Sequence, residues 1–283
     1  MTAVMKPARL LVFWDYDTQW GWDRSRMKPR PASWGHLEFE CTERLLELHA
    51  AYEVPACFAV VGAAALEGER PYHDPAQIRR IHGAKHEVAS HSFRHEWLPG
   101  LSRVELLKTL RLSKEALEQC VGAPVKTFVP PWNQPFDYPG GWSFSLAERR
   151  EAGAQRNDLR DVCVALGEAG YEFCRVAYRP LPTRLLAMAL RRDFEPLGRL
   201  ESISGITCVR LNSPGGFGQR SRSLLERCAS AGGLLVVYGH PHALLGEHDQ
   251  GERMLIPFLK RVQELCRAGS LRVSLPRDME RAA

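Results

Sequence analysis

Short apolar segments alternate with amphipathic segments along almost the whole chain. Most of the apolar segments are nearly continuous, which is typical of parallel strands that are buried on both faces. Strand–helix alternation repeated seven or eight times predicts an α/β fold, a single (β/α) barrel domain that occupies residues 1–283. The expected strands are 10–14, 55–62, 86–89, 125–129, 171–176, 206–211, 234–238 and 271–275.

The amphipathic segments carry recognisable helix starts and stops. Thr42 is expected to open a helix over 43–51, and the last helix is expected to run over about 253–268 with Gly269 as its stop. In a capping box, a Ser side chain and a Glu three residues later each bind the other's backbone N–H. Capping boxes predict three further starts, at Ser102–Glu105, Ser145–Glu148 and Ser223–Glu226.

Two segments interrupt this alternation and are expected to be loop insertions, at about 23–40 and 133–157. Loops of such length in a compact domain are usually binding elements or disordered segments. Both follow strand ends that carry candidate chemistry, so we interpret them as binding elements. The basic run Arg24–Arg30 in the first loop is either a solvated surface or a contact for a phosphate-bearing substrate.

Composition is that of an ordinary soluble globular protein, with 45% hydrophobic and 25% charged residues. The net charge of +5 comes without a Lys/Arg tract, so we expect no nucleic-acid partner, and no apolar run reaches the roughly 20 residues of a membrane span. The expected partner is a small-molecule or glycan substrate, and the oligomeric state is left open. Eight scattered cysteines without a CxxC pair, and an N-terminus unlike a signal peptide, predict a cytoplasmic location.

Candidate chemistry concentrates at His91-Ser-Phe-Arg-His95 and at Asp15-Tyr-Asp17. Two imidazoles four positions apart can face one point, and a carboxylate at a strand end can supply a third ligand. A His₂-carboxylate set leaves an open coordination position, which is typical of a catalytic Zn²⁺ site, although Co²⁺, Ni²⁺, Fe²⁺ or Mn²⁺ can also occupy it. Asp15 would then be free for proton transfer. The alternative is that these residues only form a strand-end turn and a capped surface turn.

These motifs resemble those of the NodB-homology polysaccharide deacetylases, carbohydrate esterase family 4. Their order and spacing agree with that family over about 9–245. The resemblance implies a distorted (β/α)₇-type barrel with its site at the carboxyl ends of the strands. The matching segments are 42–62 for the helix–strand element, 86–95 for the metal motif, 128–132 for the third motif and 238–240 for the fifth.

Carried over position by position, the resemblance implies a role for each residue. Asp15 is the general base, and His240 is the general acid that protonates the departing amine, with His242 as a competitor for that role and a buried core histidine as the alternative. The family uses the backbone N–H after its Pro-Pro step to stabilise the oxyanion. The implied divalent-metal ligands are Asp17, His91 and His95, and the implied substrate-binding and oxyanion residues are Pro131, Trp132 and Asn133.

One position departs from the family pattern. The third motif usually carries an arginine that pairs with the base carboxylate, and this chain has Val129 there. Arg94 and Arg179 are the candidates for another cation beside Asp15. The departure indicates either a different substrate class or a base that has lost its partner and some activity with it.

The resulting hypothesis is a metal-dependent amide hydrolase of the deacetylase type, acting on an N-acetylated sugar or glycoconjugate precursor in polysaccharide biosynthesis. Two alternatives stay open: hydrolysis of a non-sugar amide, formamide or cyclic amide on the same scaffold, and a metal-binding pseudoenzyme. Retention of Asp15 and His240 opposes the pseudoenzyme, and Val129 is the feature that favours it. The tryptophans either stack on sugar rings or pack loops onto the barrel, and Trp132 is the strongest stacking candidate.

Overall fold

The computed structural model describes residues 7–25, 34–135, 156–177 and 198–279. Within them, the strands form one curved sheet: β1 (Ala8–Tyr16), β2 (Cys57–Val60), β3 (Glu87–Ser90), β4 (Thr127–Phe128), β5 (Phe173–Val176), β6 (Leu200–Ile203), β7 (Ile206–Arg210), β8 (Leu234–Gly239) and β9 (Leu271–Val273). Their order is β6-β7-β5-β4-β3-β2-β1-β8, and β9 pairs with β1 beside this path. Neighbouring strands are parallel, except that β6 and β7 are antiparallel.

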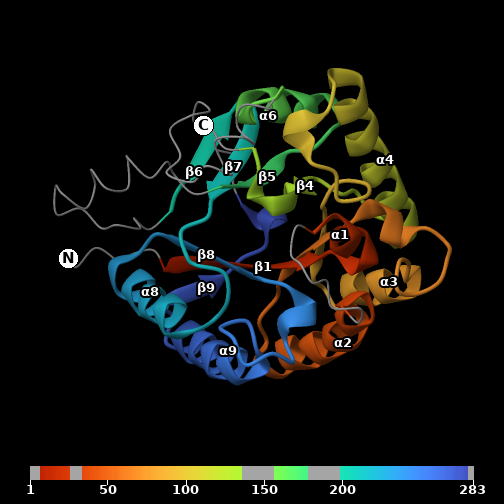
Figure 1. The fold of residues 1–283 in the computed structure, drawn as a ribbon. Helices are drawn as coiled ribbons and strands as arrows, with labels where there is room; N and C mark the ends of the chain where they lie inside the picture. Colours follow the sequence, from red (N-terminus) through yellow and green to blue (C-terminus); the bar gives the residue numbers. More distant parts are fainter. Residues whose placement is uncertain (1–6, 26–33, 136–155, 178–197, 280–283) are drawn as a thin grey trace, which may run out of the picture.

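Helices cover the outside of the sheet (Figure 1). The α-helices are α1 (Thr18–Arg24), α2 (Trp34–Tyr52), α3 (Pro75–Gly83), α4 (Arg103–Val121), α6 (Leu159–Glu168), α8 (Gln219–Ala231) and α9 (Glu252–Arg267). Short 3₁₀ turns include η1 (Gly62–Ala65), η3 (Pro131–Asn133), η4 (Pro241–Ala243) and η5 (Pro276–Asp278). No helix in the described ranges has both the length and the apolar character needed to span a bilayer.

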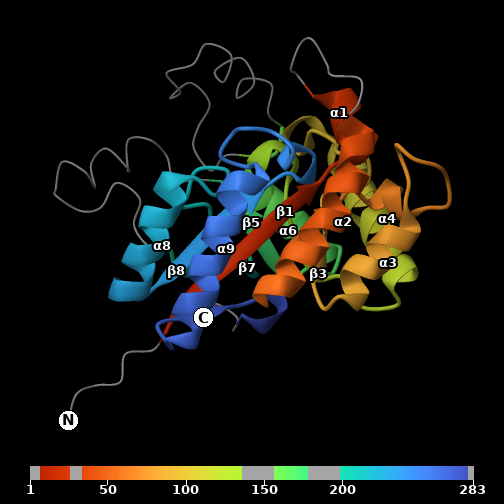
Figure 2. The same ribbon diagram turned by 90° about the horizontal axis from the view of Figure 1, so that it is seen from below.

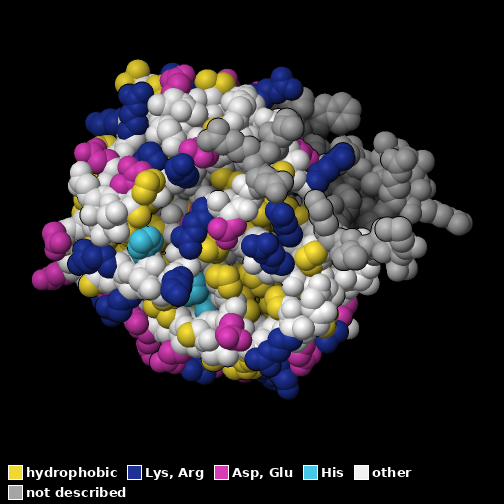
Figure 3. Space-filling view, turned by 180° about the vertical axis from the view of Figure 1, so that it is seen from behind, with side chains coloured by type: hydrophobic (Ala, Val, Ile, Leu, Met, Phe, Trp, Pro, Cys, Tyr) yellow, Lys and Arg dark blue, Asp and Glu magenta, His cyan; other side chains and the backbone are white. Residues whose placement is uncertain are grey.

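The carboxyl ends of the parallel strands lie at one end of the barrel. Figure 2 shows α1 at the end towards which β1 runs, and the parallel strands bring their carboxyl ends to the same side. Residues that directly follow these strands therefore gather there. The face behind the view of Figure 1 carries Lys/Arg and Asp/Glu side chains interspersed with apolar ones (Figure 3).

Strands β7 and β8 are not neighbours in the described sheet, and side chains connect them. An isolated antiparallel bridge joins Gly198, just before β6, to Leu234 at the start of β8. Asn212 Nδ2 donates to the Leu234 carbonyl at 2.8 Å, and Asn212 Oδ1 accepts from the Val236 N–H at 2.9 Å. Ser213 Oγ donates to the Val236 carbonyl at 2.6 Å. The fold is therefore a distorted (β/α) barrel, as expected.

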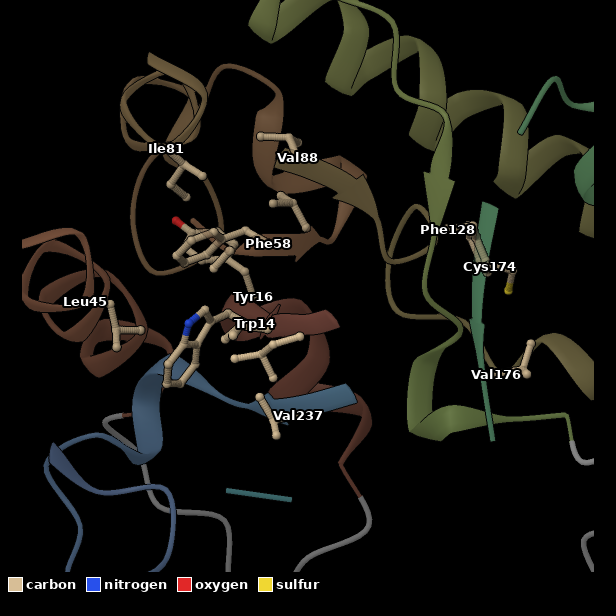
Figure 4. Packing of buried hydrophobic residues seen from close by; sticks show 14 of the residues in the cluster. Trp14, Tyr16, Leu45, Phe58, Ile81, Val88, Phe128, Cys174, Val176 and Val237 are labelled. Atoms are coloured by element: carbon tan, nitrogen blue, oxygen red, sulfur yellow. The ribbon is translucent and has the colours of Figure 1, made fainter. Parts of the chain in front are cut away.

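The apolar core has two layers, one on each face of the strands. Phe13 and Val236 belong to the cluster inside the barrel, and Trp14, Leu45 and Phe58 to the layer between sheet and helices (Figure 4). Successive side chains of a strand point to opposite faces, so a strand between two apolar layers needs apolar residues throughout. This arrangement confirms the physical basis of the strand prediction.

The expected strands are all present, and their ends agree within two residues. The prediction missed β6, which is short, only partly buried and antiparallel at the end of the sheet path. A half-buried edge strand lacks the continuous apolar run that identified the others.

The helix predictions had mixed outcomes. The capping box at Ser102–Glu105 is confirmed at the start of α4, and α9 matches the expected last helix. The box at Ser223 is wrong, because α8 already begins at Gln219 and Ser223 Oγ donates to the Gln219 carbonyl at 3.0 Å. The box at Ser145–Glu148 lies outside the described residues.

The first expected loop insertion, 23–40, is also wrong over its second part. Helix α2 begins at Trp34, so Thr42 lies inside the helix and is buried instead of capping it. Phe39 and Cys41 extend the buried face of this helix towards its start, and Phe39 packs edge-on against Tyr16 at 6.0 Å between ring centroids. Most of the second expected insertion, 133–157, lies outside the described residues.

Two buried histidines outside the candidate site couple stability to pH. His49 Nε2 accepts from Trp14 Nε1 at 2.8 Å, and His86 Nδ1 accepts from the Ala56 N–H at 3.1 Å, so both imidazoles are held neutral. Burial lowers the pKa of His49 to about 3 and that of His86 to about 4. The unfolded chain binds these protons near the ordinary pKa of 6.5, whereas the folded chain does not. The contribution of these two histidines to stability is therefore complete above pH 6.5 and is lost as the pH falls towards 4.

We expect the free energy of unfolding to fall by about 2 kcal/mol per histidine between pH 7 and pH 5. Urea unfolding at the two pH values, followed by tryptophan fluorescence, measures this change. The variant His36→Gln, at an exposed position of α2, serves as a control and should keep the pH dependence of the wild type. Equal free energies at both pH values would contradict the prediction.

Candidate metal centre and hydrolytic site

The structure brings Asp17, His91 and His95 together at the carboxyl ends of β1 and β3. Asp17 follows β1 and His91 follows β3, while His95 lies four residues further along the same loop. Asp17 Oδ1 is 3.3 Å from His91 Nε2 and 3.6 Å from His95 Nε2. In the described part of the chain, these are the residues whose potential ligand atoms converge, all within 4.8 Å of one another.

The chemistry of this cluster fits a divalent cation. His91 Nδ1 donates to the Val129 carbonyl at 2.7 Å, which leaves Nε2 as the ligand atom and fixes the ring. Asp17 Oδ1 is buried and makes no hydrogen bond with a described residue, although it faces two imidazoles. Burial alone would raise the pKa of Asp17, but the imidazoles of His95 and His91 lower it, so this carboxylate is ionised. Burial lowers the pKa of His95 to about 4, so its ring is neutral, as a ligand must be.

Helix α4 anchors the loop that carries the two histidines. Ser113 Oγ donates to the Ser92 carbonyl at 2.9 Å and lies 2.7 Å from Ser90 Oγ. Ser92 and His95 have φ values of 62° and 57°, in a region that residues other than glycine rarely adopt. Strained backbone of this kind persists where surrounding contacts enforce it, often at functional sites.

Gly21 in α1 packs directly against the Asp17 side chain. A Cβ at position 21 would lie 2.5 Å from Asp17 Cβ and 2.9 Å from Asp17 Cγ. We expect Gly21→Ala to displace this carboxylate and to weaken Zn²⁺ binding by about 10- to 100-fold, the range seen when contacts that orient a ligand are lost. A competition titration with a chromophoric chelator measures the affinity. In the matched control Gly83→Ala the new Cβ meets no atom within 4 Å, so unchanged affinity in both variants would contradict the prediction.

Asp15, the expected base, is held by a buried arginine that the sequence analysis missed. Arg175 on β5 donates from Nη1 to Asp15 Oδ1 at 2.8 Å and from Nη2 to Oδ2 at 2.7 Å. The guanidinium is fully buried and lies between the rings of Phe13 and Tyr238, at 5.1 and 4.8 Å from their centroids. Burial alone would raise the pKa of Asp15, but the charge and hydrogen bonds of Arg175 lower it below its ordinary value.

The arginine absent from position 129 is therefore replaced from another strand. Of the two candidates named from the sequence, Arg94 is wrong, because its guanidinium lies over the Trp20 ring at 5.0 Å, and Arg179 lies outside the described residues. The signal that could have found Arg175 is its place as the one positively charged residue in the largely apolar run 171–176. A fully buried cation requires a buried anion.

His240 and His242 both reach the site, with different partners. His240 Nε2 is 4.0 Å from Asp15 Oδ2, and its Nδ1 is 3.1 Å from Gln250 Oε1. His242 Nδ1 is 2.9 Å from Glu38 Oε2 on α2. Burial and the charge of Asp17 raise the pKa of the Glu38 carboxyl well above its ordinary value. Proximity to Asp15 favours His240 for the acid role.

The turn η3 lies against the Asp17–His91–His95 cluster. Trp132 packs its edge against the His95 ring at 4.4 Å between centroids, so it forms a wall of the site. Trp132 and Asn133 have φ values of 53° and 56°, and Asn133 Oδ1 accepts from Arg175 Nη2 at 2.8 Å. One guanidinium thus positions both the Asp15 carboxylate and this turn.

These groups line a single cavity of about 660 Å³. Asp15, Asp17 and His240 open into it, and α1, α2 and the turn η4 supply an apolar rim. Members of the rim are Trp22, Trp34, Leu37, Ala243 and Leu245. A cavity of this size suits a small molecule or one or two sugar units.

Comparison with known proteins agrees with this geometry. The family model described as polysaccharide deacetylase matches residues 35–136, the part that carries His91, His95 and η3. The resemblance to the polysaccharide deacetylases is confirmed. Polysaccharide deacetylases of this family generally depend on a metal, and the Asp17 cluster offers a possible site for it. The family also indicates a hydrolase that acts on acetyl or amide bonds.

Solved structures share the fold of this chain at low identity. A protein of Mycobacterium smegmatis designated a polysaccharide deacetylase is 18% identical with a TM-score of 0.61, covering 100% of this chain and 97% of its own. Puue allantoinase is 14% identical with a TM-score of 0.59, covering 95% and 88%. A mutant of a carbohydrate esterase family 4 pseudoenzyme, whose wild type comes from Bacillus anthracis, is 15% identical with a TM-score of 0.50, covering 98% and 69%. No curated protein matches the sequence.

Proposed function

We propose that this chain is a metal-dependent amide hydrolase that removes the acetyl group from an N-acetylated sugar or glycoconjugate precursor in polysaccharide biosynthesis. The observation that carries the proposal is the joint geometry of the buried Asp15–Arg175 pair and His240. Asp15 and His240 line the same cavity as Asp17, His91 and His95, and Arg175 holds Asp15 from behind.

Asp17, His91 and His95 would hold the cation, for which Zn²⁺ is the first candidate and Co²⁺, Ni²⁺, Fe²⁺ or Mn²⁺ the alternatives. When bound, such a cation supplies Lewis-acid polarisation of the amide carbonyl and makes water more acidic. The buried Nδ1–H of His91, held by the Val129 carbonyl, keeps the ring in the tautomer that this role needs.

The remaining steps belong to side chains of the chain itself. Asp15 is ionised and takes the proton of the attacking water, while Arg175 fixes the carboxylate by binding both of its oxygens. His240 donates a proton from Nε2 to the leaving nitrogen as the carbon–nitrogen bond breaks, with Gln250 holding Nδ1. Acetate and a free amine result. We assign stabilisation of the oxyanion to the Pro131–Trp132–Asn133 turn, with the Trp132 N–H as the donor.

Release of acetate tests the proposal. Protein loaded with Zn²⁺ is expected to release acetate from N-acetylglucosamine or its oligomers, and protein treated with EDTA is expected to be inactive until Zn²⁺ is restored. An enzymatic acetate assay gives the rate. Absence of release from every N-acetylhexosamine tried would reject the sugar deacetylase.

A cyclic amide is the second candidate substrate class. Puue allantoinase has a TM-score close to that of the Mycobacterium smegmatis protein, and the apolar rim formed by Leu37, Ala243 and Leu245 suits a compact ring. Hydrolysis of allantoin or hydantoin without acetate release from sugars would favour it. The pseudoenzyme alternative loses its supporting feature, because Arg175 supplies the cation that Val129 lacks.

We also place the reaction in the cytoplasm. All eight cysteines are unpaired thiols, and six of them are buried. Unpaired buried cysteines are typical of proteins that work in a reducing compartment.

A further inference from the structure

The cavity holds a second polar pair, Glu38 and His242, that the hydrolytic steps do not use. Glu38 is 1% exposed, and its Oε2 lies 2.9 Å from His242 Nδ1. The other oxygen, Oε1, is buried and makes no hydrogen bond with any residue that the structure describes. Both side chains line the cavity beside Asp17. A buried polar atom without a partner is energetically unfavourable, and a hydrogen bond from a ligand would offset that cost.

Glu38 is not part of the metal cluster. The convergent ligand atoms in the described ranges belong to Asp17, His91 and His95, and Glu38 is outside that group. Its unpaired oxygen is therefore not one of the candidate metal ligands.

Packing fixes the plane of the His242 ring. Trp34 stacks on it, with 4.2 Å between centroids and 23° between planes, and Trp22 covers Trp34 with 3.6 Å between centroids. Since Nδ1 is bound to Glu38, Nε2 is the polar ring atom left for the cavity. The stacking of Trp34 on the ring face and the contact of Nδ1 with Glu38 together fix the direction in which Nε2 points.

We propose that Glu38 Oε1 and His242 Nε2 together bind one hydroxyl group of the substrate. A carboxyl oxygen such as Oε1 accepts a hydrogen bond, and an imidazole nitrogen such as Nε2 can donate or accept one. A hydroxyl donates and accepts at once, so it satisfies both atoms, whereas an amide N–H satisfies only Oε1.

The position of the pair indicates which part of the substrate carries this hydroxyl. His242 follows the candidate acid His240 by two residues, and the two rings are 5.4 Å apart between centroids. The hydroxyl therefore lies on the side of the departing amine, which makes that amine a hydroxylated one. This inference rests on the proposed deacetylase function and narrows it to amino sugars with a free ring hydroxyl.

A cycle of enzyme and substrate variants tests the inference. The substrates are the methyl glycoside of N-acetylglucosamine and its 3-deoxy, 4-deoxy and 6-deoxy forms, each assayed with Zn²⁺-loaded protein. In the wild type, one deoxy form should lose at least about tenfold in kcat/KM. In Glu38→Met, which has a similar volume but no acceptor, the same deletion should cost less than about threefold. Glu38→Gln provides the conservative second variant and should give an intermediate loss.

Two controls separate recognition from structure. Glu40→Met changes an exposed glutamate of the same helix and should behave as the wild type with every substrate. Zn²⁺ affinity of Glu38→Met, measured by chelator competition, should stay within about threefold of the wild type, because Glu38 is not a ligand.

The outcomes are distinguishable. Acetate release by the wild type with equal losses for all deoxy forms in the wild type and in Glu38→Met would overturn this inference and leave the proposed function intact. Failure of the wild type to release acetate from these glycosides, and also from N-acetylglucosamine and its oligomers, would overturn both. A tenfold or greater loss of Zn²⁺ affinity in Glu38→Met would also overturn the inference, since Glu38 would then act through the metal.

Discussion

Replacement of Asp15 by Asn is expected to lower kcat for acetate release by about 10²- to 10⁴-fold, the usual contribution of a general base. The amide cannot take a proton from water, although it keeps the shape of the carboxylate. Zn²⁺ affinity should change by no more than a few-fold, because Asp15 is outside the Asp17–His91–His95 cluster. Initial rates with saturating N-acetylglucosamine, together with a chelator competition for Zn²⁺, measure the two properties.

Asp17→Asn provides the matched comparison two residues away. It removes a charged ligand, so both activity and Zn²⁺ affinity should fall. If Asp15→Asn lost metal as strongly as Asp17→Asn, or if it kept wild-type kcat, the division of roles between the two carboxylates would be wrong.

Replacement of Arg175 by Met is expected to lower the free energy of unfolding by about 3–5 kcal/mol, because it leaves the Asp15 carboxylate buried without its cation. Both groups are almost completely buried, so solvent screens the interaction little. Activity should also fall, since Arg175 positions Asp15 and also donates a hydrogen bond to Asn133 Oδ1. Urea unfolding gives the stability, and the acetate assay gives the rate.

A double-mutant cycle isolates the pair from general damage to the core. In the Asp15→Asn background, the loss of unfolding free energy caused by Arg175→Met should be smaller than in the wild type by about 2 kcal/mol or more. The reason is that the buried carboxylate charge is already absent from that background. Arg160→Met, at an exposed position of α6, should leave stability within about 0.5 kcal/mol of the wild type. Additive losses in the cycle would show that Arg175 stabilises the barrel by packing alone.

The sequence predicted the strands and the metal cluster because their signals are local. A strand buried on both faces needs an apolar residue at every position, and residues that follow parallel strands meet at one end of the sheet. His91 and His95 lie in one loop after β3. Asp17 follows β1, which is separated from β3 by one strand of the sheet, β2. Their convergence follows from the barrel alone.

The pairing of Arg175 with Asp15 could not be read from the sequence, because it joins residues 160 positions apart. Position 175 shows only that a cation lies within an apolar strand. Which anion it meets depends on barrel closure, which brings β5 and β1 to face each other across the interior.

The start of α2 was missed for a local reason. The basic, proline-containing segment before Trp34 has the composition of a loop, and it concealed the start of the helix, whose buried face includes Glu38 and Phe39. Glu38 was not predicted for the same reason, because its place in the cavity depends on its being part of the helix and facing the barrel.

A crystal structure of the Zn²⁺-loaded protein, with anomalous data collected at the zinc edge, tests the central claim most directly. The account predicts one strong anomalous peak with Asp17, His91 and His95 as ligands at about 2.0–2.2 Å. It also predicts that Asp15 remains bound to Arg175 and does not coordinate the ion. A peak elsewhere, or an ion ligated by Asp15 in place of Asp17, would contradict the account.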